Sequence, residues 1–381
     1  MDLSLNEMQL MLADSVEKFI ANDYDFETRQ KYAQSQTGFS LPVWQTFAEL
    51  GWTAITIGEE DGGFGGGPVD LAVVMERLGQ GLVVEPFLSN IVLAAGVLMR
   101  AGNNEQKSRW LNAITAGELQ ASLAFVEPSA GYEISSVETT ATRDGDGDGD
   151  AWVLNGAKAY VLNGGSAELI LLPARTSGER QELDGITLFA VDARSKGVAI
   201  RDYATVDGQR AAEILLDQVN VSDDRVIGAL GQGFDALNAA INDATLAVCA
   251  EAVGIMTALT EKTIEYSKSR VQFGVPISSF QSLQHRMVDM YTACEQSRSL
   301  LMWAAMVLAD GSDDAAKAIH SIKYQVGIAG KYIGEEAVQI HGGMGVTWEL
   351  DVAHYFKRLT AIGVQFGNAD WHLDRLAAMP G

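Results

Sequence analysis

The sequence predicts an α+β protein in which a helical N-terminal domain, a middle antiparallel β domain and a C-terminal helical domain follow one another. Apolar residues recur every three or four positions up to about residue 120 and again after about residue 227, whereas short β-prone runs fill the segment between them. Helices and strands do not alternate, which argues against a doubly wound parallel sheet. We expect domains at 1–120, 121–226 and 227–381.

The first domain is expected to be helical because its apolar residues share one face in several runs, and the Gly-rich stretch EEDGGFGGGP (59–68) separates two of them. These runs are LNEMQLMLADSVEKFI (5–20), LPVWQTFAELGW (41–52), VDLAVVMERLGQGL (69–82) and SNIVLAAGVLMRAG (89–102).

The middle domain is expected to form strands, because its runs are short, rich in Val, Ile, Leu and aromatic residues, and bounded by Gly, Asp and Asn. The runs are ASLAFVEP (121–128), AWVLNGAKAYVLNGG (151–165), AELILLPAR (167–175), ITLFAVDA (186–193) and AAEILLDQVNV (211–221). Long helical patterns return after Gly228 and continue to the end of the sequence.

Composition narrows the function classes. The chain has 381 residues and a net charge of −23, which disfavours binding to nucleic acid or to an anionic membrane surface. Two cysteines are too few for a disulfide framework. The first residues lack the basic start and apolar core of a signal peptide, and no uncharged apolar run is long enough to span a bilayer. We expect a cytoplasmic protein.

Three motifs favour structural readings. The acidic stretch Asp144–Asp150 begins like a calcium loop, but Asn155 stands where a bidentate Glu is required, so an acidic turn is expected. The stretch GQGFDA (231–236) follows no β-α-β pattern and is expected to start a helix. The histidines show no metal-ligand spacing and are expected to bind no metal; they are His285, His320, His341, His354 and His372.

Glu251 is the charged residue that stands out in the third domain. It is the only charged residue between Ala244 and Thr260, and no residue one turn away on its helix offers a counter-charge. A buried, unpaired carboxylate is costly and tends to shift its pKa upward. Glu251 is therefore expected either to pair with a distant residue, such as an Arg from another helix, or to take part in proton chemistry.

Two further segments indicate a ligand site. In SRVQFGVPISSFQSLQHR (269–286), Arg270 stands beside an aromatic-Gly-x-Pro break, and Arg is the natural bidentate reader of phosphate. In QIHGGMGV (339–346), paired glycines let backbone N–H groups approach a ligand closely.

Together these segments resemble the acyl-CoA dehydrogenase family over essentially the whole chain, and the sequence looks closest to the small subunit of the pimeloyl-CoA dehydrogenase type. The resemblance implies a C-terminal four-helix bundle that also forms the oligomer interface. It implies FAD as cofactor and oxidation of an acyl-CoA to the trans-2-enoyl-CoA, in fatty acid or steroid side-chain β-oxidation. Electrons would pass to an electron-transfer flavoprotein.

The resemblance also implies site residues. Arg270 would reach across a dimer interface to the FAD pyrophosphate, with Gln272, Phe273, Phe280 and Gln281 beside it. Gln339, Gly342 and Gly343 would meet the adenosine half of the flavin. The family's Thr-Glu-Pro-Gly-Ala-Gly-Ser-Asp appears here as VEPSAGYE (126–133), and its Trp-Ile-Thr as YVL (160–162), so the backbone N–H groups of Val126 and Leu162 would serve the flavin ring.

The proton-abstracting base differs from the usual one. Most members place a Glu in a turn near the C-terminus, where this sequence has Phe366. A minority supply the base from the helix before the Arg loop, so Glu251 is the predicted catalytic base. Alternatives are a subunit that completes the flavin site of a hetero-oligomer without chemistry of its own, or a flavin oxidase. A homodimer, a homotetramer and a heterotetramer with a second such subunit all stay open, as does the acyl chain: medium-chain, dicarboxylyl, branched or steroid.

Overall fold

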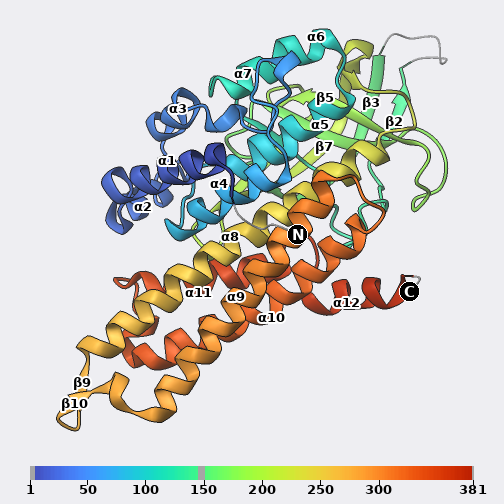
Figure 1. Cartoon of the computed structure of the whole chain (residues 1–381). Coiled ribbons are helices and arrows are strands. Elements are labelled where there is room, and N and C mark those ends of the chain that lie inside the picture. Colours follow the sequence, from blue (N-terminus) through green and yellow to red (C-terminus); the bar gives the residue numbers. More distant parts are fainter. Residues whose placement is uncertain (1–4, 145–150, 380–381) are drawn as a thin grey trace. The chain divides into compact units, whose positions relative to one another are not determined.

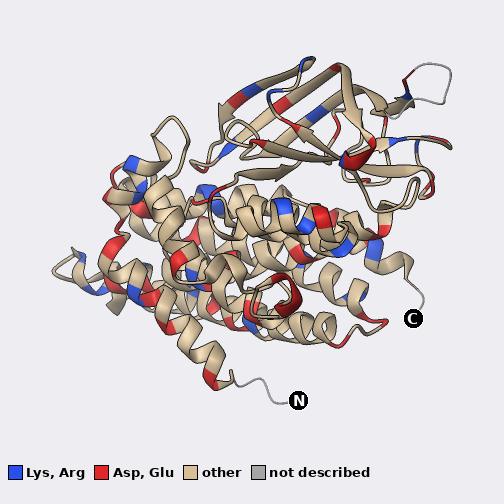
Figure 2. Ribbon diagram, turned by 90° about the horizontal axis from the view of Figure 1, so that it is seen from above, with Lys and Arg blue, Asp and Glu red and all other residues tan. Residues whose placement is uncertain are grey.

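The computed structural model of the chain describes residues 5–144 and 151–379 (Figure 1). Its contacts group into two compact units. We call Met1–Lys31, Gly67–Val83 and Thr245–Gly381 the helical unit, and Tyr32–Gly66 and Val84–Ala244 the β unit. The predicted acidic turn lies outside the described residues except for Asp144. Acidic residues are distributed over helices and strands alike (Figure 2).

The helical unit is built mainly from helices, two of which also include residues of the β unit, at 32–33 and 234–244. The helices are α1 (Glu7–Asp23), α2 (Phe26–Ala33), α4 (Pro68–Gln80), α8 (Phe234–Ser269), α9 (Gln281–Ala309), α10 (Ala315–His341), α11 (Asp351–Val364) and α12 (Ala369–Ala378), with the short turns η6 (Ile277–Ser279) and η7 (Gly342–Val346) and the strands β9 (Val271–Gln272) and β10 (Val275–Pro276). Helix α10 packs against α9, α11 and α12, and α4 packs against α1 and α9. The sequence of α8 is long and apolar enough to cross a membrane, but 83% of its apolar window is buried inside the protein.

The β unit combines short helices with an eight-stranded sheet. The helices are α3 (Leu41–Glu49), η1 (Trp52–Ala54), η2 (Glu59–Asp61), η3 (Leu88–Ala95), α5 (Gly96–Ala101), α6 (Asn104–Gln106), η4 (Lys107–Leu111), α7 (Asn112–Thr115) and η5 (Asp223–Arg225). The strands are β1 (Ala121–Leu123), β2 (Thr140–Arg143), β3 (Ala151–Leu162), β4 (Leu169–Arg175), β5 (Ile186–Asp192), β6 (Val198–Ala204), β7 (Arg210–Ser222) and β8 (Val226–Ile227).

The sheet is mainly antiparallel. Its strands follow the order β6-β7-β3-β2-β4-β5-β8, and β1 pairs with β4 in parallel. The inward-facing side chains of these strands form one buried apolar cluster that includes Trp152, Leu154, Ile170, Phe189 and Ile214. Alternation of buried and exposed residues is clearest in β7, which therefore has one face on this cluster and one face in solvent.

Helices α4 and α8 approach each other through glycine. A Cβ atom added at Gly254 of α8 would lie 1.8 Å from the carbonyl oxygen of Glu76 on α4, and one added at Gly79 of α4 would lie 2.2 Å from the carbonyl oxygen of Glu251. Each glycine thus gives the other helix's backbone the space that a side chain would fill. The Glu76 side chain in turn accepts a hydrogen bond from Arg298 of α9 (3.3 Å).

The predicted fold class is confirmed: helices come first, an antiparallel middle domain follows, and α8 to α11 form the C-terminal bundle. The stretch GQGFDA starts a helix, since α8 begins at Phe234. Strands β2, β6 and β8 were not among the expected runs; β2 and β8 are short, and Arg201 and Asp202 interrupt the apolar residues of β6. The three domain boundaries stay a prediction, because contacts place α1 and α4 with the C-terminal helices.

Replacing Gly254 by Ala should destabilise the protein, because the new methyl group would push α4 and α8 apart. We expect a loss of about 1–3 kcal/mol in the free energy of unfolding, as for other overpacked sites. The matched control is Gly363→Ala in α11, where the added Cβ meets no atom within 4 Å and helix propensity should improve. Urea unfolding of both variants checks this, and equal stability of the two would refute the contact.

Candidate functional site

The Arg270 segment forms an exposed hairpin at the end of α8. Strands β9 and β10 pair antiparallel, and Phe273 and Gly274 make the turn with positive φ angles of 55° and 82°. The Arg270 side chain is exposed, and it makes no ion pair with any residue of the described chain. A solvent-facing guanidinium without a carboxylate is available to bind an anionic ligand.

The predicted neighbours of Arg270 lie on or beside the same hairpin. Gln272 ends β9, Phe273 is 92% exposed at the tip, and the Phe273 and Phe280 rings meet edge to face with centroids 6.1 Å apart. Gln281 is exposed and begins α9. The structure therefore brings all five predicted residues of this segment together.

The second predicted segment lies at the C-terminal end of α10. Gln339 is exposed in the last turn of the helix, which ends at His341. Gly342 follows with φ at 60°, and Cβ atoms added at Gly342 or Gly343 would meet no atom within 4 Å. The two glycines thus leave open space beside their backbone, into which a ligand can enter closely.

A pair of rings joins the two segments. The Tyr266 and His341 rings stack with centroids 4.3 Å apart, and the Tyr266 hydroxyl donates a hydrogen bond to the His341 carbonyl (3.4 Å). Tyr266 also accepts, at its carbonyl, the backbone N–H of Arg270 (2.9 Å). The start of the hairpin is therefore fixed next to Gly342. Sequence reasoning missed Tyr266, whose only signal is its position one helical turn before Arg270.

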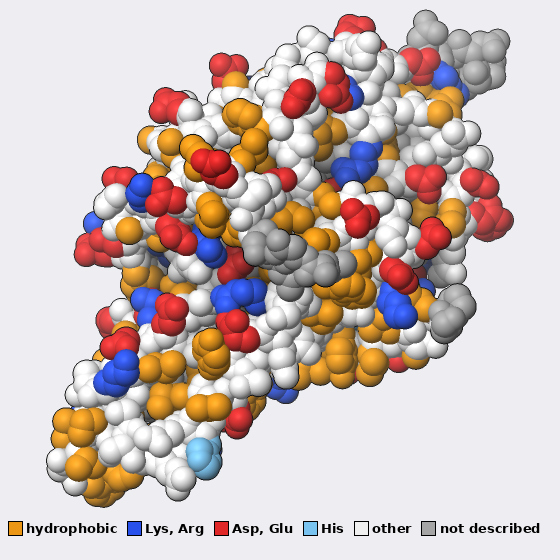
Figure 3. All heavy atoms as spheres, in the orientation of Figure 1, with side chains coloured by type: hydrophobic (Ala, Val, Ile, Leu, Met, Phe, Trp, Pro, Cys, Tyr) orange, Lys and Arg blue, Asp and Glu red, His pale blue; other side chains and the backbone are white. Residues whose placement is uncertain are grey.

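Large apolar side chains near these segments are exposed. On the hairpin they are Val271, Phe273 and Val275, and on the stretch after α10 they are Met344, Val346 and Trp348, all between 40% and 92% exposed. Figure 3 shows hydrophobic side chains gathered where Figure 1 places β9 and β10. A concentration of exposed apolar side chains indicates a binding or subunit surface.

In the β unit the two predicted backbone contacts lie on neighbouring segments. The Val126 carbonyl accepts a hydrogen bond from the backbone N–H of Ala159 (2.9 Å), and the Leu162 carbonyl accepts one from the Ser122 hydroxyl (2.9 Å). The register of β3 against β7 shifts between Lys158 and Val161. The loop after β1 and the irregular end of β3 are thus joined.

A buried ion pair holds this loop. Glu127 accepts hydrogen bonds from Lys158 Nζ (2.6 Å) and from the backbone N–H groups of Glu138 (2.6 Å) and Thr139 (3.1 Å). Burial opposes ionisation of Glu127, but Lys158 and these donors outweigh it and lower the carboxyl pKa. Burial lowers the pKa of Lys158 to about 8, partly offset by Glu127. Both groups are therefore charged at neutral pH.

Glu251 has a partner that its own helix does not show. Arg358 of α11 donates from Nε to Oε1 (2.6 Å) and from an Nη to Oε2 (2.7 Å), and Glu251 and Arg358 are only 5% and 2% exposed. Of the two alternatives, pairing with an arginine from another helix is present in the structure, while the catalytic role of Glu251 stays a prediction. Because both carboxylate oxygens already accept charged hydrogen bonds, the geometry counts against Glu251 as a base.

The usual base position also lacks a carboxylate. Phe366 lies half-buried in the turn between α11 and α12, with a φ of 55°. Within residues 5–144 and 151–379, no group of three or more His, Cys, Asp and Glu side chains is arranged to hold a metal ion. At the usual base position the chain therefore carries an aromatic ring in place of a carboxylate.

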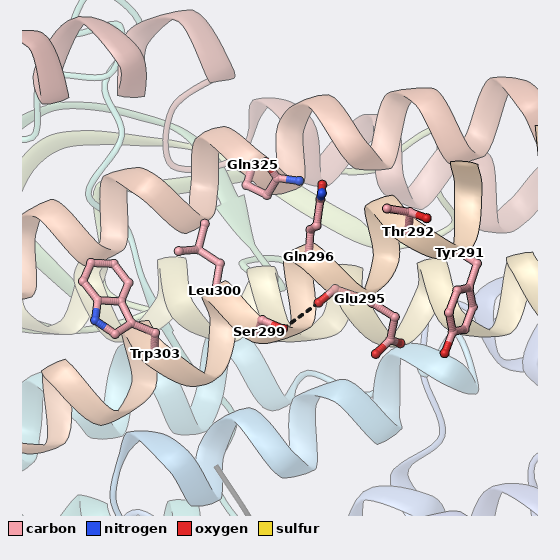
Figure 4. A pocket seen from close by; sticks show the side chains of 8 residues that line it. All are labelled: Tyr291, Thr292, Glu295, Gln296, Ser299, Leu300, Trp303 and Gln325. Atoms are coloured by element: carbon pink, nitrogen blue, oxygen red, sulfur yellow. Dashed lines mark hydrogen bonds between the residues drawn. The ribbon is translucent and has the colours of Figure 1, made fainter. Parts of the chain in front are cut away.

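One surface pocket lies elsewhere. It has a volume of about 670 Å³ and lies along α9, with one residue from α10 (Figure 4); its lining residues are Tyr291, Thr292, Glu295, Gln296, Ser299, Leu300, Trp303 and Gln325. It contains no residue of the predicted flavin site.

Comparisons with known proteins cover the whole chain. Three family models match in order: the acyl-CoA dehydrogenase N-terminal domain at residues 6–118, the middle domain at 122–219 and the C-terminal domain at 231–379. The sequence is 27% identical to the acryloyl-CoA reductase (NADH) of Anaerotignum propionicum over 98% of this chain and 94% of that one. It is 28% identical to the human mitochondrial short-chain specific acyl-CoA dehydrogenase over 82% of this chain and 76% of that one.

Among solved structures, the chain is similar to one in the ChsE4–ChsE5 complex from Mycobacterium tuberculosis. The TM-score is 0.89 at 26% identity, and the alignment covers 100% of both chains.

A double-mutant cycle should show whether the buried pair is structural. Arg358→Leu or Glu251→Leu alone leaves one buried charge without its partner, and each should cost about 3–5 kcal/mol of unfolding free energy. The double replacement leaves no unpaired charge and should recover a large part of that loss. Denaturant unfolding measures all four proteins, and losses that simply add would contradict the assignment.

Proposed function

Because the chain belongs to the acyl-CoA dehydrogenase family, we propose that it takes part in the α,β-dehydrogenation of an acyl-CoA thioester to the trans-2-enoyl-CoA. It is an FAD-dependent oxidoreductase of the class that acts on CH–CH bonds. We propose an electron-transfer flavoprotein as the electron acceptor. We also propose that this protein is located in the cytoplasm. The relation to an acryloyl-CoA reductase fits the same carbon–carbon chemistry run in the opposite direction.

The observation that supports this function best is the Arg270 segment. Its exposed guanidinium has no acidic partner in the described part of the chain, and the open backbone of Gly342 and Gly343 is joined to it through Tyr266 and His341. These features fit an anionic pyrophosphate with an adenosine beside it. When bound, FAD would be the group that accepts the hydride.

The β unit would contribute the other contacts. The backbone N–H groups of Val126 and Leu162 lie on segments that the Glu127–Lys158 pair and the Ser122 hydroxyl fix in place. Fixed backbone donors need no side-chain hydroxyl to bind a flavin ring, so the loss of the family's Thr residues is compatible with ring binding.

The residues at the two candidate base positions, Glu251 and Phe366, favour a second function. Arg358 occupies both oxygens of Glu251, and an apolar Phe366 stands at the usual position. We infer that this chain works as a subunit that completes a flavin site in an assembly with a second acyl-CoA dehydrogenase-like chain, which supplies the base. Two observations support such an assembly: the hairpin exposes apolar residues, and the whole chain is similar to a chain of a two-protein complex.

Arg270→Ala should weaken FAD binding, because a charged hydrogen-bond donor to phosphate is lost. A loss of about 1.5–3 kcal/mol corresponds to an affinity roughly 10- to 150-fold lower. The ratio of flavin to protein absorbance and a fluorescence titration with FAD measure it. Arg194→Ala, at an exposed position of the β unit, is the control and should retain wild-type flavin content. An unchanged affinity of Arg270→Ala for FAD would show that Arg270 does not bind the FAD phosphates.

Flavin bleaching by a panel of acyl-CoAs tests the source of the base. We expect the wild-type chain alone to bind FAD but to bleach slowly or not at all, and Phe366→Glu to gain bleaching by at least tenfold, since it restores a carboxylate to the turn. Fast bleaching by the wild type that disappears in the Glu251→Leu/Arg358→Leu double variant would instead identify Glu251 as the base and refute the subunit role.

A further inference from the structure

The turn that carries Phe366 is bound by a buried lysine. Lys323 of α10 is 0% exposed, and its ammonium donates a hydrogen bond to the Gly367 carbonyl (2.7 Å). This carbonyl is the only hydrogen-bond acceptor that the described residues offer to Lys323, and no carboxylate among them pairs with it. A buried cation that lacks a counter-ion is costly, so its presence at this carbonyl requires an explanation.

A histidine binds the preceding carbonyl of the same turn. His372 Nε2 lies 3.0 Å from the Phe366 carbonyl oxygen, and His372 Nδ1 lies 2.8 Å from His320 Nδ1. Since a carbonyl can only accept, Nε2 of His372 carries its proton and donates. Burial lowers the pKa of His372 to about 3, so the ring is neutral and its Nδ1 accepts from His320.

The backbone of the turn requires such support. Phe366 has a φ of 55°, a region that non-glycine residues seldom adopt, and Gly367 has a φ of 109°. A Cβ atom at Gly367 would lie 2.6 Å from both His372 Nε2 and Trp371 Cε3. Asn368 then caps α12 by accepting the Trp371 backbone N–H (2.9 Å). Two consecutive carbonyls and the following cap are all tied down.

We propose that Lys323 and His372 are positioning residues that fix the Phe366–Gly367 turn and thereby set the place of the Phe366 side chain. This inference rests on the proposed function, in which Phe366 stands where related enzymes have their base. The two side chains come from α10 and α12, so the turn is held from two helices at once. A single position for Phe366 would define the acyl end of the substrate site.

The pKa of Lys323 differs from the pKa values of the groups around it, so its titration can be followed separately. Burial lowers the pKa of Lys323 to about 8, and Cys249 of α8 acts in the opposite direction. The other groups facing it titrate elsewhere: burial raises the pKa of Cys249 to about 12 and lowers the pKa values of His320 and His372. Between about pH 8 and 10.5 the unfolded chain therefore binds more protons at Lys323 than the folded chain, and stability due to this group rises with pH.

Fluorine NMR of the full-length chain tests the proposal directly. With 4-fluorophenylalanine at position 366, we expect one sharp resonance whose shift titrates with a midpoint near pH 8. Lys323→Met should abolish this titration and broaden or split the resonance, whereas Lys331→Met, an exposed lysine of the same helix, should leave the spectrum unchanged. His372→Leu should also split the resonance, and His372→Gln, which keeps a donor, should restore it.

A single resonance with an unchanged titration in Lys323→Met and His372→Leu would overturn the proposal. Thermal unfolding across pH 7–10.5 is a second test. The melting temperature of the wild type, relative to that of Lys323→Met, should rise with pH. A difference that does not change with pH would contradict the buried-lysine argument. Acyl-CoA affinities should shift by at least fivefold in Lys323→Met at unchanged FAD affinity. A wild-type chain that binds FAD neither alone nor together with a second acyl-CoA dehydrogenase-like chain would refute the proposed function, while the fluorine spectra would still decide the role of the turn.

Discussion

The ion pair between Glu251 and Arg358 is the interaction on which the helical unit depends, because it joins helices from distant parts of the sequence at one buried point. The backbone of Glu251 lies against Gly79 of α4, its side chain binds α11, and Tyr355 of α11 donates a hydrogen bond to the Gln80 carbonyl at the end of α4 (2.5 Å). Two ions this far from water are tolerated because the contact is bidentate and complete. The close approach of α4 and α8 and the position of α11 therefore belong to one arrangement.

The sequence predicted the elements better than their contacts, and the reason is physical. Apolar periodicity is a local record of which face is buried, so it identified the helices and most of the strands. The isolated charge of Glu251 indicated a special role for this residue of α8, but its partner Arg358 lies 107 residues away on another helix. No spacing rule connects such positions, and both the paired and the catalytic reading were compatible with the sequence. Only the folded chain shows that Arg358 binds both carboxylate oxygens.

The candidate site shows the same division. Arg270, Gly342 and Gly343 were found from their own motifs, because an arginine beside a turn and paired glycines have local meanings. The contact that unites them, the stacking of Tyr266 on His341, depends on how α8 and α10 pack. Likewise the Glu127–Lys158 pair joins a loop to a strand 31 residues further on. Sequence motifs thus indicated candidate ligand-binding groups, whereas the residues that hold these groups in place could be found only in the folded chain.

The distribution of cations explains why so few residues would determine cofactor affinity. In a chain with a net charge of −23, long-range attraction of an anionic flavin or CoA is not available, and at physiological salt charges act over only about 8 Å. Three cations are buried and already bind acceptors within the protein: Arg358 binds a carboxylate, Lys158 binds a carboxylate and a carbonyl, and Lys323 binds a carbonyl. None of these three can reach a ligand without leaving a buried acceptor unsatisfied. The task falls to exposed cations such as Arg270, whose contribution is local and therefore not compensated by the rest of the protein's charge.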